Sequence, residues 1–475
     1  MDVSSNESCN EVSTRLLFGA KLTVYSVIRY PEFLIIFRHM ITPFLKGLLV
    51  LGIWLGTGWV QAQSYSSYMV GDTADITTAT LPGTVLMGGA GDNDDALTWM
   101  LTRSGGGDIV VLRASGSDGY NDYLYSDLGV AVNSVETIVF NTAAAATDPY
   151  VIARIEQAEA LWIAGGDQWD YISYWRDTPV ETAINYLINE KQVPVGGTSA
   201  GMAIQGQGYF SAENGTVTSA QALMNPYANA VTIGYDDFIE NPALQHIITD
   251  THFDNPDRKG RLVAFMARLY TDQGIQPFAI ACEEFTAVCI DENGIATVFG
   301  EYPAYDDFAW FVQVNCEGET IPEVCEDGEK LTWNRDAAAL KVIKAPGRIN
   351  GEGTVDLNDW KTITGADVTW ENWWVEDGSL ELESDAAAID CSSSPTSLNT
   401  TAPSAVACFP NPAHTNLQLF LPVMGNVELM DLTGSVVYSR QHAAGTAVLP
   451  VNRLSNGIYI LRFDGTYIDK VVIQH

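Results

Sequence analysis

The sequence predicts a layered α/β domain followed by a small all-β sandwich. From Leu81 to about Gly300, short apolar runs alternate with longer amphipathic stretches, which is typical of βα units around a mainly parallel sheet. Near the C-terminus, alternating apolar runs are separated by Gly and Asn turns, as in a β-sandwich. The composition, with 47% hydrophobic and 17% charged residues, indicates a globular chain, and 475 residues suffice for two or three folded units.

The apolar runs of the α/β domain give five expected strands and two expected helices. The strands are Gly83 to Met87, Asp108 to Leu112, Thr137 to Phe140, Ala160 to Ile163 and Val193 to Val195, and the helices are Asp94 to Arg103 and Thr178 to Glu190. Gly-rich loops follow several of these strands. Because ligands of open α/β sheets bind beyond the carboxyl ends of the strands, the functional site is expected in these loops.

The chain divides into four expected regions. Residues 1–62 are interpreted as an N-terminal extension and a secretory signal, because an apolar run from Gly47 to Val60 ends in small residues and is shorter than the ~20 residues of a membrane span. Met40 is an alternative start. Residues 63–390 form the α/β domain, with irregular β structure after about Glu301. A Ser/Thr/Pro-rich linker at 391–404 leads to the sandwich at 405–475.

Charge and cysteine content exclude several function classes. A net charge of −35 repels nucleic-acid backbones and anionic membrane surfaces, so no nucleic-acid partner is expected. No Cys-x-x-Cys or His-Cys cluster is present, and neither a metal nor a cofactor is expected. Six cysteines remain after the predicted signal, and export permits disulfides. Cys316 and Cys325, which bracket a polar loop, are the best candidates for a local bridge.

A candidate nucleophile lies in the segment Gly197-Thr198-Ser199-Ala200-Gly201, directly after the expected strand Val193 to Val195 and before a helix-like stretch from Met202 to Gln207. Glycines on both sides permit a sharp strand-to-helix turn that exposes the Ser199 hydroxyl. The amide of Ala200 is then placed to donate to a developing oxyanion. The pattern therefore predicts a serine nucleophile at residue 199.

A serine hydroxyl needs a base, and residues 63–390 contain two histidines, His246 and His252. His252 follows an apolar strand and enters a polar loop, so it is the expected base, whereas His246 is expected to be structural. A second Gly-rich loop, Gly165 to Gln168, follows the strand Ala160 to Ile163. The amide of Gly166 is the expected second donor to the oxyanion.

These blocks together resemble the cyanophycinase and dipeptidase E group of serine peptidases (peptidase family S51). The matching segments are Gly165 to Gln168, Gly197 to Gly201, Asp250 to Phe253, Arg258 to Leu262, Leu86 to Gly91 and Ser115 to Asn121. The resemblance implies a flavodoxin-like sheet in a three-layer sandwich similar to class I glutamine amidotransferases. It also implies a relay of serine, histidine and an acidic residue.

By position, the resemblance assigns Ser199 and His252 directly and makes Glu213 the nearest acidic residue, with Asp250 and Asp236 as alternatives. It also implies that Gln168, with Arg258 or Arg261, binds an aspartyl carboxylate, since a guanidinium donates two parallel hydrogen bonds to a carboxylate. Thr251 stands where the family has Gln in its Asp-Gln-His-Phe block, so one substrate contact is altered.

The resemblance implies hydrolysis of β-aspartyl bonds, as in the β-Asp-Arg polymer cyanophycin, or of related aspartyl peptides. The alternative is a catalytically silent extracellular binding protein that retains the fold. A homodimer is possible on this resemblance. The intact nucleophile, base and Gly-rich loops favour the enzyme over the silent binder.

The C-terminal unit resembles the sorting domain of the type IX secretion system. The matching blocks are Phe409 to Pro412, Leu429 to Gly434, Leu454 to Ile460 and Lys470 to Ile473, in this order. The resemblance implies that the type IX machinery is a partner. It also implies a secreted or cell-surface location after export across the outer membrane.

Overall fold

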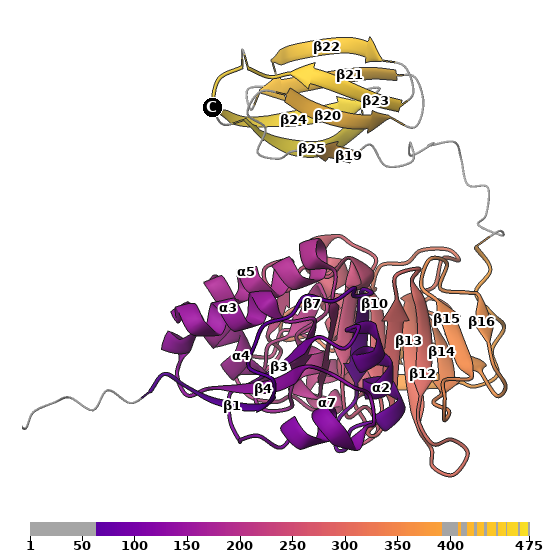
Figure 1. Ribbon diagram of the computed structural model, residues 1–475. Coiled ribbons are helices and arrows are strands. Elements are labelled where there is room, and N and C mark those ends of the chain that lie inside the picture. Colours follow the sequence, from indigo (N-terminus) through magenta and orange to yellow (C-terminus); the bar gives the residue numbers. More distant parts are fainter. Residues whose placement is uncertain are drawn as a thin grey trace, which may run out of the picture. The chain divides into compact units, whose positions relative to one another are not determined.

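The computed structural model describes residues 63–391 and, with short gaps, the strands between residues 407 and 473 (Figure 1). The predicted signal at 1–62 and nearly all of the predicted linker lie outside the described residues. No helix within the described part of the chain has the length and apolarity needed to cross a bilayer. The α/β domain and the C-terminal sandwich are each described by themselves.

The α/β domain is built on a ten-stranded sheet whose centre is parallel, in the order β4-β3-β5-β6-β2. Its strands, from one edge to the other, are β1 (Tyr65–Gly71), β4 (Ser134–Phe140), β3 (Asp108–Arg113), β5 (Ala160–Ile163), β6 (Pro194–Thr198), β2 (Gly83–Met87), β11 (Ala287–Asp291), β12 (Ile295–Phe299), β15 (Gly353–Asp356) and β16 (Ile363–Thr364). All five expected strands are present, and the prediction of an α/β fold is confirmed.

Helices cover both faces of the parallel strands. Alternate residues of β3 belong to different cores: Val110 and Leu112 pack with the helices α3 and α5, whereas Ile109 and Val111 pack with α2. Figure 1 shows α3 and α5 side by side. The helices and short helical turns are α2 (Asp94–Arg103), η1 (Tyr123–Asp127), η2 (Ala143–Thr147), α3 (Pro149–Gln157), α4 (Gln168–Trp175), α5 (Pro179–Tyr186), η3 (Leu187–Lys191), α6 (Ala200–Ala203), α7 (Ser219–Met224), η4 (Pro242–Leu244) and α8 (Lys259–Gln273).

Local sequence explains where the two predicted helices begin and end. The Asn93 side chain accepts a hydrogen bond from the Ala96 amide and caps α2, which has acidic residues in its first turn and Arg103 in its last, as predicted. Helix α5 begins with Pro179, a favoured first residue. It is shorter than predicted, because a π-helical turn, η3, takes over after Tyr186.

A second, eight-stranded sheet corrects the expectation of irregular β structure after about Glu301. Its order is β18 (Ser379–Glu383), β17 (Thr369–Glu376), β14 (Leu340–Pro346), β13 (Phe308–Val314), β10 (Phe278–Cys282), β9 (Ile247–Asp250), β7 (Gly208–Phe210) and β8 (Ile233–Tyr235). Strand β13 is buried at six of its seven residues. A strand buried on both faces lacks the polar alternation that identifies a strand in a sequence, which explains why β13 was not recognised.

The two sheets share a core. Leu86 and Val288 of the first sheet belong to one apolar cluster with Ile280 and Phe311 of the second. The other face of the second sheet packs against α8 through residues such as Phe265. This packing brings the carboxyl ends of β6, β9 and β10 close together, and these strand ends position the site described below.

The disulfide differs from the expected one. Cys316 is bonded to Cys391, across 75 residues of sequence, whereas Cys325 is a free thiol. Cys325 is buried in the cluster that contains Leu331 and Trp333, and so lies apart from Cys316 despite its closeness in sequence. Cys282 and Cys289 are also buried free thiols.

The C-terminal domain is a sandwich of two small sheets, as predicted. One sheet has the order β19 (Ala407–Phe409), β20 (Asn416–Leu421) and β23 (Gly445–Pro450), and the other has the order β22 (Val436–His442), β21 (Gly425–Asp431), β24 (Gly457–Phe463) and β25 (Thr466–Ile473). Leu417 and Leu449 of the first sheet share a core with Leu429, Leu461 and Val471 of the second. Strand β23 was not expected from the sequence.

Candidate active site

Ser199 occupies a sharp turn between strand β6 and the one-turn helix α6. Its backbone has φ 53° and ψ −117°, a conformation that is strained for a residue with a side chain and that often marks functional sites. A Cβ atom on Gly201 would lie 2.0 Å from the Ile163 carbonyl oxygen, so only glycine permits this close approach. The helix after the turn ends at Ala203, earlier than the expected Gln207.

Ser199 contacts an imidazole from the second sheet. The Oγ atom of Ser199 lies 2.9 Å from Nε2 of His252, which follows strand β9. Nδ1 of His252 lies 2.7 Å from Oε1 of Glu284, which follows the neighbouring strand β10. With the proton on Nδ1, the imidazole donates to Glu284 and accepts from the Ser199 hydroxyl. Three strand ends therefore bring a hydroxyl, an imidazole and a carboxylate into one chain of contacts.

Glu284 takes the place that the sequence assigned to Glu213. Glu213 is exposed, its backbone amide donates to Oγ of Ser211, and among the described residues no contact joins its carboxylate to His252. The hydrogen bond from His252 lowers the pKa of Glu284, which keeps its carboxylate ionised. The sequence offered one cue for Glu284, which lies two residues after the apolar run Phe278–Cys282 at the carboxyl end of a strand, but no motif block marks it.

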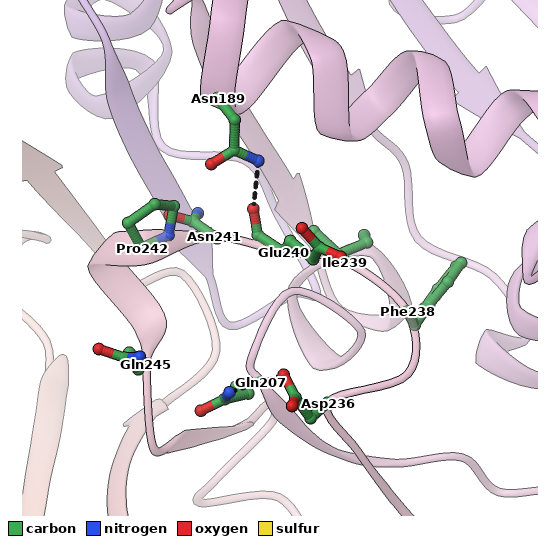
Figure 2. Close-up of a pocket in the computed structure, with 9 residues that line it drawn as sticks. All are labelled: Asn189, Gln207, Asp236, Phe238, Ile239, Glu240, Asn241, Pro242 and Gln245. Atoms are coloured by element: carbon green, nitrogen blue, oxygen red, sulfur yellow. Dashed lines mark hydrogen bonds between the residues drawn. The ribbon is translucent and has the colours of Figure 1, made fainter. Parts of the chain in front are cut away.

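The two alternative acidic residues are engaged elsewhere. Asp250 is buried and forms a bidentate ion pair with Arg261. Asp236 accepts a hydrogen bond from Gln207 and lines a different pocket of about 240 Å³, where Asn189 donates to the Glu240 carbonyl (Figure 2). Neither carboxylate contacts His252.

A pocket of about 250 Å³ opens in front of Ser199 and His252. It is lined by Gly89, Ala90, Gly91, Asp92, Arg113, Tyr120, Ala164, Gly165, Thr198, Ser199 and His252. Gly89 has φ 110°, and a Cβ atom there would lie 2.5 Å from Nε2 of His252. The loop at Gly89 therefore approaches the His252 imidazole more closely than a residue with a side chain would allow.

The predicted oxyanion donors, Ala200 and Gly166, are each the chain neighbour of a residue that lines this pocket. Ala200 is the first residue of α6, so its amide has no acceptor within that helix. Gly165 lines the pocket, with its side-chain position 3.4 Å from Cβ of Ser199, whereas Gly166 is exposed and does not line it. The role of the Gly166 amide stays a prediction.

The predicted substrate-binding side chains do not line the pocket. Gln168 donates from Nε2 to the Phe210 carbonyl, and Arg258 donates from Nη1 to the Thr251 carbonyl, at 2.8 Å each. Burial, and then the charge of Arg261, lower the pKa of Arg258. Arg261 is 4% exposed and donates from Nε and Nη2 to Asp250, and it does not line the pocket, so the structure does not bring it to Ser199 as the substrate-binding prediction requires.

Comparison with known proteins finds two relationships. The chain is 24% identical to a cyanophycinase of Synechococcus elongatus over 222 residues, which are 45% of this chain and 64% of that one. It is 27% identical to a cyanophycinase of Trichormus variabilis over 151 residues, 32% of this chain and 45% of that one. The matched part therefore spans less than two thirds of these relatives. Residues 407–474 match the secretion system C-terminal sorting domain, which indicates export by the type IX route and a secreted or cell-surface location.

Two solved structures show a low similarity to part of this chain. One is a peptidase from an acI-B1 Actinobacterium, with a TM-score of 0.33 and 12% identity over 47% of this chain and 90% of that one. The other is a putative peptidase E of Listeria monocytogenes, with a TM-score of 0.31 and 14% identity over 47% of this chain and all of that one. Scores at this level carry no argument about function.

Proposed function

We propose that this exported chain, which is similar to cyanophycinases, is a serine peptidase that hydrolyses aspartyl or β-aspartyl bonds through an acyl-enzyme. The observation that carries the proposal is the chain of contacts from Ser199 through His252 to Glu284. An activated serine requires a base within hydrogen-bond reach and a third group that orients the base, and the three side chains meet both conditions.

In the proposed mechanism, Nε2 of His252 takes the proton of the Ser199 hydroxyl while Oγ attacks the scissile carbonyl. The Glu284 carboxylate stabilises the imidazolium that forms. The amides of Ala200 and of the loop at Gly165 and Gly166 are the proposed donors to the tetrahedral oxyanion, each typically worth about 3 kcal/mol of transition-state stabilisation.

Collapse of the tetrahedral intermediate completes acylation. The imidazolium returns its proton to the leaving amine as the C–N bond breaks, and the acyl group stays on Ser199 as an ester. A water molecule then attacks this ester, with His252 again accepting a proton. The carboxylic acid product leaves, and the Ser199 hydroxyl and the neutral imidazole are regenerated.

The substrate class rests on the similarity to cyanophycinases. Two features of this chain argue for testing cyanophycin and shorter peptides together. Thr251 replaces a Gln of the family. Arg261, a carboxylate ligand in the family pattern, forms an ion pair with Asp250 in this chain. The substrate site therefore differs in detail from the pattern that the resemblance implied.

The test is release of β-Asp-Arg from cyanophycin, in parallel with cleavage of β-aspartyl and α-aspartyl dipeptides, by the wild-type protein and by Ser199→Ala. Turnover that Ser199→Ala abolishes supports the proposal, and the preferred substrate identifies the linkage. Wild-type protein that binds these peptides without cleaving any of them would instead favour a silent binding protein and contradict the proposed enzyme.

A further inference from the structure

The pocket in front of Ser199 contains a guanidinium to which the sequence drew no attention. Arg113 is the last residue of β3, a central strand of the parallel sheet, and it lines the pocket together with Ser199 and His252. Side chains at the carboxyl ends of parallel strands face the ligand crevice of such sheets. Arg113 therefore lies where a substrate group next to the scissile bond would be bound.

Arg113 has no carboxylate partner. Its Nε and Nη1 atoms donate to the carbonyls of Ser115 and Ser117, which are neutral acceptors, and no hydrogen bond from Nη2 is found among the described residues. Residues 63–391 contain nine arginines, seven of which form ion pairs with carboxylates within 4.0 Å. The chain has 59 acidic residues, yet this arginine in the pocket of the proposed nucleophile forms no ion pair, which suggests that it binds an anionic ligand.

The acidic residue of the same pocket does not neutralise Arg113. Asp92 forms no ion pair among the described residues and accepts a hydrogen bond from the Tyr120 hydroxyl at 3.1 Å. Burial raises the pKa of Asp92. Arg113 and Asp92 line the same pocket without forming an ion pair, so the guanidinium keeps donors for a ligand.

The loop after β3 fixes the guanidinium in place. This loop supplies the two carbonyl acceptors. Its Gly116 also lies against the guanidinium, since a Cβ atom on Gly116 would lie 2.4 Å from Nη2 of Arg113. A guanidinium that is held rigidly loses little side-chain freedom when it binds an anion. Its remaining donors suit a carboxylate, which accepts hydrogen bonds from a guanidinium in a planar arrangement.

We propose that Arg113 binds the free carboxylate of the aspartyl residue whose carbonyl Ser199 attacks, and thereby selects aspartyl over asparaginyl substrates. This inference rests on the proposed function and names the residue that sets its specificity. In aspartate, the two carboxyl carbons are separated by the same three bonds whichever of them carries the scissile bond. One carboxylate site at Arg113 therefore serves α-aspartyl and β-aspartyl linkages alike.

The pocket size agrees with a single short acyl residue. Its volume of about 250 Å³ lies below the range of roughly 300–1,000 Å³ that is typical of small-molecule sites. Arg258 and Arg261 do not line this pocket, and Arg261 is already paired. The carboxylate-binding role therefore moves from those two arginines to Arg113.

The test measures discrimination. We would compare kcat/KM for α-aspartyl, β-aspartyl and asparaginyl p-nitroanilides in the wild type, Arg113→Gln and Arg113→Lys. Because a charged hydrogen-bonded contact is typically worth about 1.5–3 kcal/mol, Arg113→Gln should lower kcat/KM for the aspartyl substrates about 10- to 100-fold and leave the asparaginyl substrate nearly unchanged. The kcat/KM of Arg113→Lys for the aspartyl substrates should lie between the values of the wild type and of Arg113→Gln. Arg176→Gln, which alters an arginine outside the pocket, is the matched control.

A second readout does not depend on activity. In a Ser199→Ala background, calorimetry with an aspartyl dipeptide and its asparaginyl analogue should show a 10- to 100-fold increase in Kd on Arg113→Gln for the aspartyl ligand alone. Equal losses for both ligands, with unfolding temperatures unchanged, would overturn the inference. If the wild-type protein binds the aspartyl ligand more tightly than the asparaginyl ligand but cleaves neither, the role of Arg113 is upheld and the proposed enzyme is refuted.

Discussion

In the proposed mechanism, Glu284 orients the imidazole of His252 and compensates the positive charge that the imidazole gains during the reaction. Replacing it by Gln removes the charge while keeping the shape. We expect Glu284→Gln to lower kcat about 10²- to 10⁴-fold with little change in KM, because the carboxylate acts on the transition state and does not line the substrate pocket. Steady-state kinetics on any substrate cleaved by the wild type gives both constants.

The matched control is Glu213→Gln, which removes the acidic side chain that the sequence favoured. Glu213 is exposed and makes no side-chain contact with His252, so its substitution should leave kcat within about two-fold. A loss of kcat in Glu213→Gln that matches the loss in Glu284→Gln would contradict the relay described here.

Gly89 brings the loop after β2 against the imidazole. We expect Gly89→Ala to abolish activity, because the added Cβ would lie 2.5 Å from Nε2 of His252 and because its φ of 110° strains any side chain. Gly119→Ala, where a Cβ would meet nothing within 4 Å, should be silent. Activity and thermal unfolding of both variants would be measured, and an active Gly89→Ala enzyme would show that the loop does not hold this position.

At the residue scale, the sequence singled out the proposed nucleophile and the proposed base, which the structure brings to 2.9 Å from each other, but not the residues around them. Ser199 lies between glycines after an apolar strand, and His252 follows another apolar strand. These local patterns predict that both residues lie at strand ends. No motif block marks Glu284 or Arg113. Their roles depend on which strand ends meet, and this follows from sheet order rather than from local sequence.

At the scale of elements, the Asp250–Arg261 pair joins strand β9 to helix α8 just behind the base. Both side chains are at most 4% exposed. Arg261→Met should lower the free energy of unfolding by about 3–5 kcal/mol, because it leaves a buried carboxylate without its partner. The double variant Asp250→Leu/Arg261→Met should recover most of that loss.

Denaturant unfolding of the single and double variants measures this coupling. The KM of the folded Arg261→Met enzyme should stay near that of the wild type, because the guanidinium does not line the pocket. If Arg261→Met raised KM while leaving the free energy of unfolding unchanged, Arg261 would be a substrate ligand after all.

Glu283 links the end of β10 to β13, since its carboxylate accepts hydrogen bonds from the Phe308 amide and from Nε1 of Trp310. Burial raises the pKa of Glu283 from 4.5 to about 7 in the folded protein. The folded state therefore binds a proton that the unfolded state has lost. This contribution to stability is complete below pH 4.5 and is lost as the pH rises through about 7.

The measurement is the free energy of unfolding of the wild type and of Glu283→Gln between pH 4.5 and 8. A shift of this size corresponds to about 3 kcal/mol, so the wild type should lose up to that amount relative to the always-neutral variant over this range. Parallel pH profiles of the two proteins would show that Glu283 does not titrate in this way.

Among the elements, the parallel strands and helix α2 could be predicted because their apolar periods and caps are local. The second sheet could not. Its central strands are buried on both faces, and its order brings β9 and β10, from the middle of the chain, beside β13, β14 and β17. The Cys316–Cys391 bond is equally non-local and closes the chain over 75 residues.

At the scale of the whole molecule, the chain combines an α/β domain that carries the candidate site with a C-terminal domain that indicates export. The sandwich could be predicted from its ordered sequence blocks, because each block marks a turn or a strand of a small sheet. Export also accounts for a disulfide in a protein that otherwise keeps buried free thiols. The net charge of −35 suits an exported protein and disfavours binding to a nucleic-acid backbone.

The proposed acyl-enzyme on Ser199 can be trapped by acid-quenching samples during turnover of an activated β-aspartyl ester and located by intact-protein and peptide mass spectrometry. We expect one aspartyl group on the peptide that contains Ser199, and none in Ser199→Ala. Turnover of the ester with no acyl group on Ser199, or with the acyl group on another residue, would contradict a covalent role for Ser199.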